Sequence, residues 1–307
     1  MRRPPCFFLF LLLAASPCLA SISLDDFLSA LETNGVLANR SHAVRGGLEG
    51  ILRSVDPEAV LGAESVAVAD HAGRPAVESV ELWPEDLAYI KGGTLVSGGG
   101  AEIMAHLRAL GDKAGLILDL RGMGGDDLPS LSLLAGLGRE DGTPLFVVTD
   151  NQDKPLSTNS VETTVSINSP LMVLVDRDTR DAAEALAVLW KGRQGIMLVG
   201  TETRGNLRFR ELLTLPDGQR VAVATRKMTL PGGRVYNGDG LPPDVVVNSE
   251  AASVNAMLSS TNPPARVLSV KSEGDLELMA RVEGDITLRR ATDILLGLRL
   301  LGGYGKR

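Results

Sequence analysis

A chain of 307 residues can bury a sizeable apolar core and form one large or two modest domains. Its formal net charge of -7 argues against nucleic acid or an anionic membrane surface as a partner, because a phosphate-binding face needs an excess of basic residues. Arg204, Arg208 and Arg210 do cluster, but they alternate with apolar residues, which is more typical of the solvated face of a strand.

The amino terminus predicts an export signal. Two arginines precede an apolar run from Cys6 to Ala15, and the small residues of Cys18–Ala20 offer a cleavage point. The run is shorter than the ~20 apolar residues that span a bilayer. We therefore expect a cleaved signal peptide over residues 1–20 and a secreted or periplasmic protein, peripheral to a membrane at most. A retained anchor is the alternative.

Thiol and metal chemistry are not expected. Both cysteines, Cys6 and Cys18, lie in the segment that cleavage removes. The three histidines, His42, His71 and His106, do not stand at metal-ligand spacing. The sequence therefore predicts no disulfide, no metal site and no cofactor in the mature chain.

The next segment predicts helices, followed by short strands. Residues 24–61 carry apolar side chains at helical spacing, with acidic residues near the start and Pro57 near the end, which indicates a helical region over 21–62. Residues 63–100 combine short alternating stretches with Gly and Pro breaks, and predict a few short strands.

From residue 101 to about residue 250, apolar runs alternate with amphipathic segments. Continuous apolar runs are typical of parallel strands that helices cover on both faces. Alternation of such strands with helices predicts an α/β layered domain with parallel pairing. The predicted helices are 101–110, 128–138 and 182–190, and the predicted strands are 115–120, 144–150 and 170–176.

Two elements complete the chain. Alternation at period two on both sides of Pro216, Asp217 and Gly218 predicts a β-hairpin, because this triplet is a strong turn signal. Apolar residues at helical intervals between 285 and 303 predict a terminal helix within a C-terminal helical segment, 251–307.

Several motifs stand in the order and near the spacing of one enzyme family. They are LDLRGMGG (118–125), VLVD followed by AAE (173–184), VGTETRGN (199–206), the LPDG turn (215–218) and GDGLPPDVVV (238–247). With them the chain resembles the C-terminal processing peptidases, the tail-specific serine proteases of family S41.

The resemblance implies a fold as well as an activity. It implies a crotonase-like α/β fold, with an N-terminal helical arm, a layered core of β-sheet and helices over 101–250, and a part rich in β-hairpins towards the C-terminus. In the family a peptide-binding PDZ domain stands between arm and core. Here the interval 63–100 holds only a few short strands, so we expect that the PDZ domain is missing.

The reactive positions of the family hold other residues in this chain. The resemblance places the nucleophilic serine at Asp181, the general-base lysine at Asn206 and an orienting glutamine at Arg210. A serine hydroxyl needs a base to remove its proton, and an asparagine amide is not a useful base. Thr179 is the one nearby hydroxyl, and Lys191 and Lys227 are the remote lysines that could activate it.

The anion-binding frame of the family is retained. The resemblance assigns the N–H donors of the oxyanion hole to Gly124, Gly125 and Ala182. An aspartate beside such donors would compete for them as a permanent anion. We hypothesise that Asp181 and Arg210 form an ion pair that closes the former active site; the alternative is that both side chains point to solvent.

These residues predict an inactive S41 peptidase-like protein, a pseudopeptidase, that binds peptides or partner proteins in the inherited groove. One alternative is an active serine-type peptidase with non-standard catalytic residues. Another is acyl-CoA chemistry with Asp181 or Glu184 as acid or base, against which the export signal argues. The third is a structural domain that self-associates into a homo-oligomer.

Overall fold

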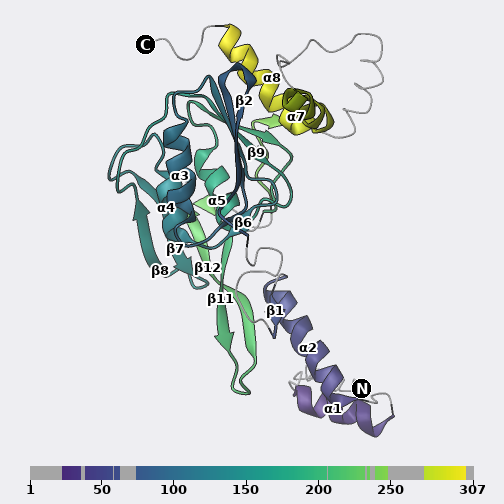
Figure 1. The fold of residues 1–307 in the computed structure, drawn as a ribbon. Coiled ribbons are helices and arrows are strands. Elements are labelled where there is room, and N and C mark those ends of the chain that lie inside the picture. Colours follow the sequence, from purple (N-terminus) through teal and green to yellow (C-terminus); the bar gives the residue numbers. More distant parts are fainter. Residues whose placement is uncertain are drawn as a thin grey trace, which may run out of the picture. The chain divides into compact units, whose positions relative to one another are not determined.

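The computed structural model describes residues 23–35, 39–57, 59–62, 74–205, 207–231, 234–235, 239–247 and 273–301. The chain divides into two compact units, Met1–Pro57 and Glu58–Arg307 (Figure 1). The predicted signal peptide, both cysteines, His71 and Asn206 lie outside the described residues, as does part of the interval where the PDZ domain was expected to be missing.

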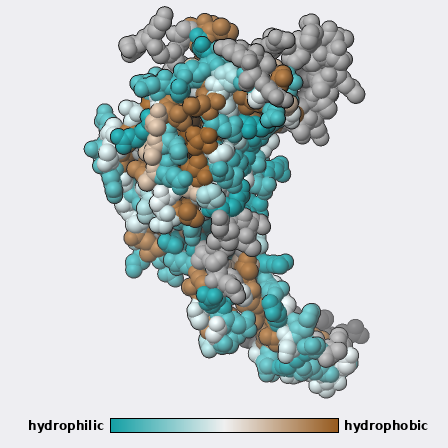
Figure 2. All heavy atoms as spheres, in the orientation of Figure 1, coloured by the Kyte–Doolittle hydropathy of each residue, from teal (hydrophilic) through white to brown (hydrophobic). Residues whose placement is uncertain are grey.

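The described part of the first unit contains two helices, α1 (Leu24–Thr33) and α2 (Arg40–Val55). Each begins at a residue whose side chain caps it: Ser23 accepts a hydrogen bond from the N–H of Asp26 at 3.1 Å, and Asn39 does so for a first-turn N–H of α2 at 2.9 Å. Exposed apolar side chains lie at i, i+3 and i+7 on α2, among the hydrophilic ones (Figure 2). These are Leu48, Ile51 and Val55.

The helical periodicity predicted up to residue 61 ends earlier. Asp56 has extended backbone angles, because the ring of Pro57 disfavours a helical conformation in the residue before it. Val60–Leu61 forms the short strand β1, which belongs to the second unit.

The main sheet of the second unit is predominantly parallel. Its only antiparallel pair among the described strands is β2 with β3, at one edge. In spatial order the strands are β14 (Val245–Val246), β10 (Ile196–Gly200), β9 (Leu171–Val175), β5 (Gly115–Asp119), β3 (Leu87–Gly92) and β2 (Val77–Trp83), and the 3₁₀ turn η1 (Pro84–Asp86) joins β2 to β3.

Helices cover both faces of this sheet, as the continuous apolar strands predict. Successive residues of β5 alternate between the two sides: Leu116 and Leu118 belong to one apolar cluster and Ile117 to the other, all fully buried. The first cluster includes side chains from α3 (Gly99–Ala109), α4 (Leu128–Ala135) and α5 (Asp181–Trp190), and the second includes side chains from α7 (Glu273–Gly284) and α8 (Ile286–Leu300).

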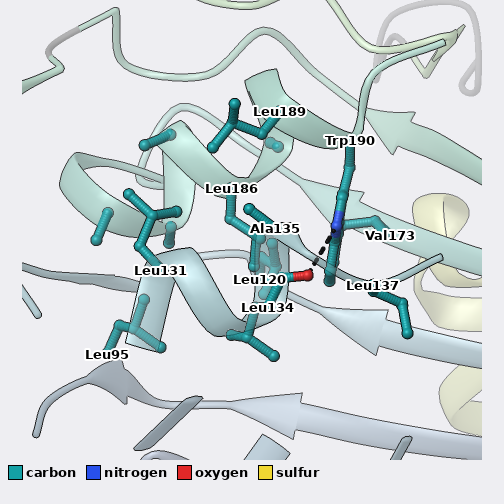
Figure 3. Close-up of a cluster of buried hydrophobic side chains, with 14 of the residues drawn as sticks. Leu95, Leu120, Leu131, Leu134, Ala135, Leu137, Val173, Leu186, Leu189 and Trp190 are labelled. Carbon is teal, nitrogen blue, oxygen red and sulfur yellow. Dashed lines mark hydrogen bonds between the residues drawn. The ribbon is translucent and has the colours of Figure 1, made fainter. Parts of the chain in front are cut away.

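Figure 3 shows part of the first cluster, where buried side chains of α4 and α5 pack together. Trp190 is fully buried at the end of α5, and its indole N–H donates to the carbonyl oxygen of Leu134 in α4 at 3.1 Å. A buried indole N–H needs such an acceptor, since an unpaired donor in the core is costly. The bond therefore joins the carboxyl ends of the two helices.

A second sheet is antiparallel. Its described strands are β1, β7 (Pro144–Asp150), β8 (Pro155–Ser160), β11 (Arg208–Thr214), β12 (Arg220–Leu230) and β13 (Arg234–Val235). The predicted hairpin is confirmed, because β11 pairs with β12 and the N–H of Gly218 closes the turn onto the carbonyl of Leu215 at 2.9 Å.

One strand was placed in the wrong sheet by the sequence pattern. Residues 144–150 form β7 as predicted, but β7 belongs to the antiparallel sheet and not to the parallel one. The four residues 151–154 that join β7 to β8 allow only antiparallel pairing, because a parallel neighbour needs a crossover of a dozen residues or so.

Candidate active site

The diglycine turn follows β5 and is held by backbone bonds. Gly124–Gly125 forms the short strand β6, which pairs in parallel with β4 (Thr94–Leu95). Gly125 has φ +116°, and a Cβ at this position would stand 2.3 Å from the carbonyl oxygen of Leu95. Only glycine fits such a conformation and such a close approach.

The loop between β9 and α5 is fastened to the diglycine turn. The carboxylate of Asp176 accepts hydrogen bonds from the N–H groups of Gly122 at 3.0 Å and Thr179 at 2.9 Å. The N–H of Arg180 donates to the carbonyl of Met123, directly before Gly124, at 3.0 Å. The start of α5 therefore lies beside the diglycine turn. The hydrogen bonds that hold the two together join segments more than 50 residues apart in the sequence.

Asp181 is the first residue of α5, and its backbone is in the left-handed region, with φ +52°. Such a conformation is costly for a residue with a side chain and persists only where the surroundings impose it. The side chain is 12% exposed, and its carboxylate lies 3.3 Å from Nη1 of Arg210 and 3.8 Å from Nε of Arg180. The predicted ion pair between Asp181 and Arg210 is confirmed, and the solvent-facing alternative is wrong.

The burial of Arg210 corrects the expectation of a solvated strand face. Its side chain is 4% exposed, whereas Arg204 is exposed and Arg208 is half-buried. The ladder between β11 and β12 shifts register between Phe209 and Arg210. The extra residue of this bulge is Thr225 in β12, because Phe209 pairs with Arg226 and Arg210 with Ala224. Phe209 and Arg210 are both buried beside it.

Glu184 holds the TETRGN segment against α5. It is 1% exposed, and one of its carboxylate oxygens accepts hydrogen bonds from the hydroxyl of Thr203 and, at 2.6 Å, from the N–H of Gly205. The hydroxyl of Thr203 also accepts from the N–H of Leu241 at 2.8 Å. Asn206 itself lies outside the described residues, but its neighbour Gly205 is bonded to the first turn of α5.

The predicted oxyanion residues lie on two adjacent elements. Ala182 is the second residue of α5 and is fully buried, and its N–H has no acceptor within the helix because it belongs to the first turn. Gly124 and Gly125 form β6, which pairs with Thr94 and Leu95 of β4. The structure thus gathers Asp181, Arg210, Ala182 and the diglycine turn.

A buried ionic network beneath the turn was missed by the sequence reasoning. Asp119, 1% exposed at the end of β5, accepts hydrogen bonds from Arg121 Nε at 3.0 Å, Arg121 Nη2 at 2.7 Å and the Tyr89 hydroxyl at 2.8 Å. Arg121 also pairs with Asp285, the N-cap of α8, at 2.6 Å. The sequence does carry one sign of this network, since an aspartate ends an apolar strand two residues before an arginine.

This network changes the acidity of its members. Burial alone would raise the pKa of Asp119, but the hydrogen bonds from Arg121 and the charge of Lys91 outweigh burial and hold that pKa below its usual value. Burial, together with the Asp119 carboxylate, raises the pKa of Tyr89. Asp119 is therefore ionised and Tyr89 neutral at physiological pH, which keeps the turn before Gly124 in place.

The described residues contain no group of three or more His, Cys, Asp or Glu that could hold a metal ion. Thr179, the alternative hydroxyl, is fully buried and donates to the carbonyl of Leu120 at 3.0 Å. Lys191 pairs with Asp244 at 3.5 Å, and Lys227 pairs with an aspartate of the β7–β8 turn at 2.6 Å. These two lysines thus pair with aspartates, and the Thr179 hydroxyl bonds to Leu120.

Comparison with known proteins identifies relatives of this arrangement. The chain is 29% identical over 168 residues to "C-terminal processing peptidase, chloroplastic" of Tetradesmus obliquus, which covers 54% of this chain and 36% of that protein. It is 31% identical over 181 residues to "Carboxyl-terminal-processing protease" of Picosynechococcus sp. The matched part is 58% of this chain and 43% of that protein. The chain thus spans well under two thirds of these curated relatives.

Solved structures share the fold. A lipoprotein from Streptococcus agalactiae has a TM-score of 0.54 at 19% identity, with 78% of this chain and 90% of that chain covered. A protein described as a putative peptidase from Parabacteroides merdae has a TM-score of 0.54 at 14% identity, with 82% and 94% covered. The model of peptidase family S41 matches residues 86–247, which is more than half of the chain and includes Asp181, Ala182, Arg210 and the diglycine turn. The chain therefore belongs to peptidase family S41.

Proposed function

We propose that this S41 family member is a pseudopeptidase: it has lost catalysis and binds peptides or partner proteins in its active-site groove. The observation that carries the proposal is the ion pair of Asp181 and Arg210 at the start of α5. The resemblance to the processing peptidases places the nucleophilic serine at Asp181. A carboxylate held there by a guanidinium offers no hydroxyl for acyl transfer, and its charge disfavours a second anion at the same donors.

The fold supports a finer assignment to the crotonase-like class. A parallel sheet with helices on both faces, a diglycine turn after one strand and the N-terminus of a helix beside that turn form a site where a carbonyl oxygen can accept backbone N–H groups. The assignment is thus part of the proposal, since fold alone does not define an activity.

Two alternative chemistries lack support. The Thr179 hydroxyl is engaged with Leu120 and with Asp176, so activation as a nucleophile would first require breaking these bonds. Glu184 is bonded to Thr203 and Gly205, which makes it a positioning residue for the loop and not an available acid or base for acyl-CoA chemistry.

The proposed ligand is a polypeptide, because the curated relatives are named for the processing of carboxyl termini. A secreted or periplasmic location, a cleaved signal peptide and self-association remain parts of the proposal that rest on the sequence. No helix in the described part of the chain is both long and apolar enough to cross a bilayer.

Restoring the reactive groups tests the proposal. We expect the native chain to leave unstructured peptides and casein intact, and the triple variant Asp181→Ser, Asn206→Lys, Arg210→Gln to cleave them. The Arg210 change is included because the guanidinium loses the carboxylate of Asp181 in the variant. Cleavage is measured by mass spectrometry and by release of fluorescent fragments.

The matched control is the triple variant Asp181→Ala, Asn206→Lys, Arg210→Gln, which lacks only the serine hydroxyl and is expected to be inactive. Cleavage by the native chain would show that it is an active peptidase and would overturn the proposal. Inactivity of a folded serine variant would show that the framework for catalysis is lost as well. Binding is tested separately, by fluorescence anisotropy of labelled peptides with the native chain.

A double-mutant cycle measures the ion pair itself. Asp181→Asn and Arg210→Gln, alone and combined, are expected to give a coupling energy of about 1–3 kcal/mol, because both side chains are buried and in contact. Urea denaturation of the four proteins gives this value. Arg45 and Glu49, an exposed pair at 3.2 Å on α2, provide a reference cycle with an expected coupling of about 0.5 kcal/mol or less.

A further inference from the structure

Two arginines meet where the carboxyl ends of α4 and α5 come together. Arg139 follows α4, and its Nη2 donates to the carbonyl of Leu189 near the end of α5 at 2.9 Å. Arg193 follows α5, and its Nη2 donates to the carbonyl of Gly138 after α4 at 2.8 Å. Arg139 thus reaches the last turn of α5, and Arg193 reaches the loop that follows α4. Trp190 bonds to Leu134 between the same two helices (Figure 3).

The two arginines are neighbours: Arg193 donates to the carbonyl of the residue before Arg139, and Arg139 donates to a carbonyl four residues before Arg193. Both are partly out of water. Burial, and then the charge of Arg139, lower the pKa of Arg193 to about 10, and burial lowers the pKa of Arg139. Both arginines still carry their charge at neutral pH. Like charges brought this close are unfavourable unless an anion or a dipole compensates them.

Carboxylates of the described residues do not supply this compensation. Neither arginine forms an ion pair with them. Of the acids next in sequence, Glu140 is exposed and Asp141 accepts a hydrogen bond from the hydroxyl of Thr164 at 2.8 Å. The negative end of the α5 dipole offsets part of the charge through the Leu189 carbonyl, which Nη2 of Arg139 already contacts.

Each guanidinium also has a buried nitrogen that lacks a hydrogen-bond partner among the described residues. These atoms are Nε of Arg139 and Nη1 of Arg193. A buried donor without an acceptor carries an uncompensated desolvation cost, and such groups usually bind an ordered water or an ion. Each residue as a whole is half-buried, so solvent reaches other atoms of the side chain while these two nitrogens are shielded.

We propose that Arg139 and Arg193 form a binding site for a small tetrahedral oxyanion such as phosphate or sulfate. Such an anion presents oxygen acceptors in several directions and can accept from two guanidinium groups at once, while neutralising their repulsion. Bound there, it would hold together the carboxyl ends of the two helices whose amino ends flank the candidate active site. The site is separate from that of the proposed peptide ligand.

Calorimetry and thermal unfolding of the purified chain test the site. Phosphate and sulfate are compared with sodium chloride at equal ionic strength. At an anion concentration ten times its Kd, we expect the Tm to rise by about 3 °C over chloride. The double variant Arg139→Gln, Arg193→Gln is expected to lose both the rise and the binding heat. Arg108→Gln, at an exposed arginine of α3, is the matched control and is expected to retain them.

If the Tm of the native chain did not rise more with these oxyanions than with chloride, the site would be overturned, and the two arginines would only bind backbone carbonyls. Retention of the rise in the double variant would also overturn it. Should the double variant not fold, Arg193→Lys keeps the charge but loses the planar fork, and we expect its Kd to be at least about tenfold weaker. An unchanged Kd in this variant would count against the proposal.

Discussion

Replacing Asp119 with asparagine is expected to lower the free energy of unfolding by about 3–5 kcal/mol, the range for breaking a buried ion pair on one side. Asp119 is 1% exposed and accepts from Tyr89 and from three N–H groups of Arg121. Lys91 lies 3.4 Å away. An amide has one acceptor oxygen and would turn its NH₂ group towards these donors. Urea denaturation measures the loss.

The control for this change is Asp86→Asn. The side chain of Asp86 is 52% exposed and its carboxylate pairs with Lys113 at 2.7 Å. Because solvent screens exposed pairs, we expect a loss of about 1 kcal/mol or less. Equal losses in the two variants would show that the Asp119 network contributes no more than a surface pair.

The pKa of Asp119 also predicts a pH dependence. Its pKa is lower in the folded chain than in the unfolded one, so its contribution is complete above the unfolded value of about 4. The contribution is then lost as the pH falls through the folded pKa. We expect the native chain to lose stability below about pH 4, with a shallower loss in Asp119→Asn. Denaturation midpoints between about pH 2 and 7 test this, and identical slopes would contradict it.

Gly125→Ala is expected to destabilise the chain by at least about 3 kcal/mol, combining a left-handed backbone with a steric clash. The new Cβ would stand 2.3 Å from the carbonyl oxygen and 2.7 Å from the nitrogen of Leu95, both backbone atoms of β4. Backbone cannot move aside as a flexible side chain does, so β4 and β6 would have to separate. Thermal and urea unfolding measure the effect.

Gly122→Ala separates the two causes. Gly122 also has a positive φ, +67°, but nothing lies within 4 Å of a Cβ added there. Its cost should therefore be that of the conformation alone, about 1–2 kcal/mol. If both alanine variants lost the same stability, the close approach of β4 to β6 would not be the reason for glycine at position 125.

The amino-acid sequence by itself determined the α/β class, the hairpin around residues 215–219 and the resemblance to family S41. The turn residues that predict the hairpin and the spacing of apolar residues are local properties of the sequence. A strand such as β5, which is buried on both faces, is visible in the sequence as a continuous apolar run. The ordered motifs then identified the family, whose model matches residues 86–247.

Only the tertiary structure decided how distant segments meet. It placed β7 in the antiparallel sheet, and it buried Arg210 against Asp181 beside a bulge in the ladder between β11 and β12. It also showed that Asp119 and Arg121 tie β5 to the start of α8. The local pattern of apolar residues predicts which strands exist. It does not predict which sheet a strand joins, where a bulge forms or which buried charges pair, because these depend on contacts between segments far apart in the sequence.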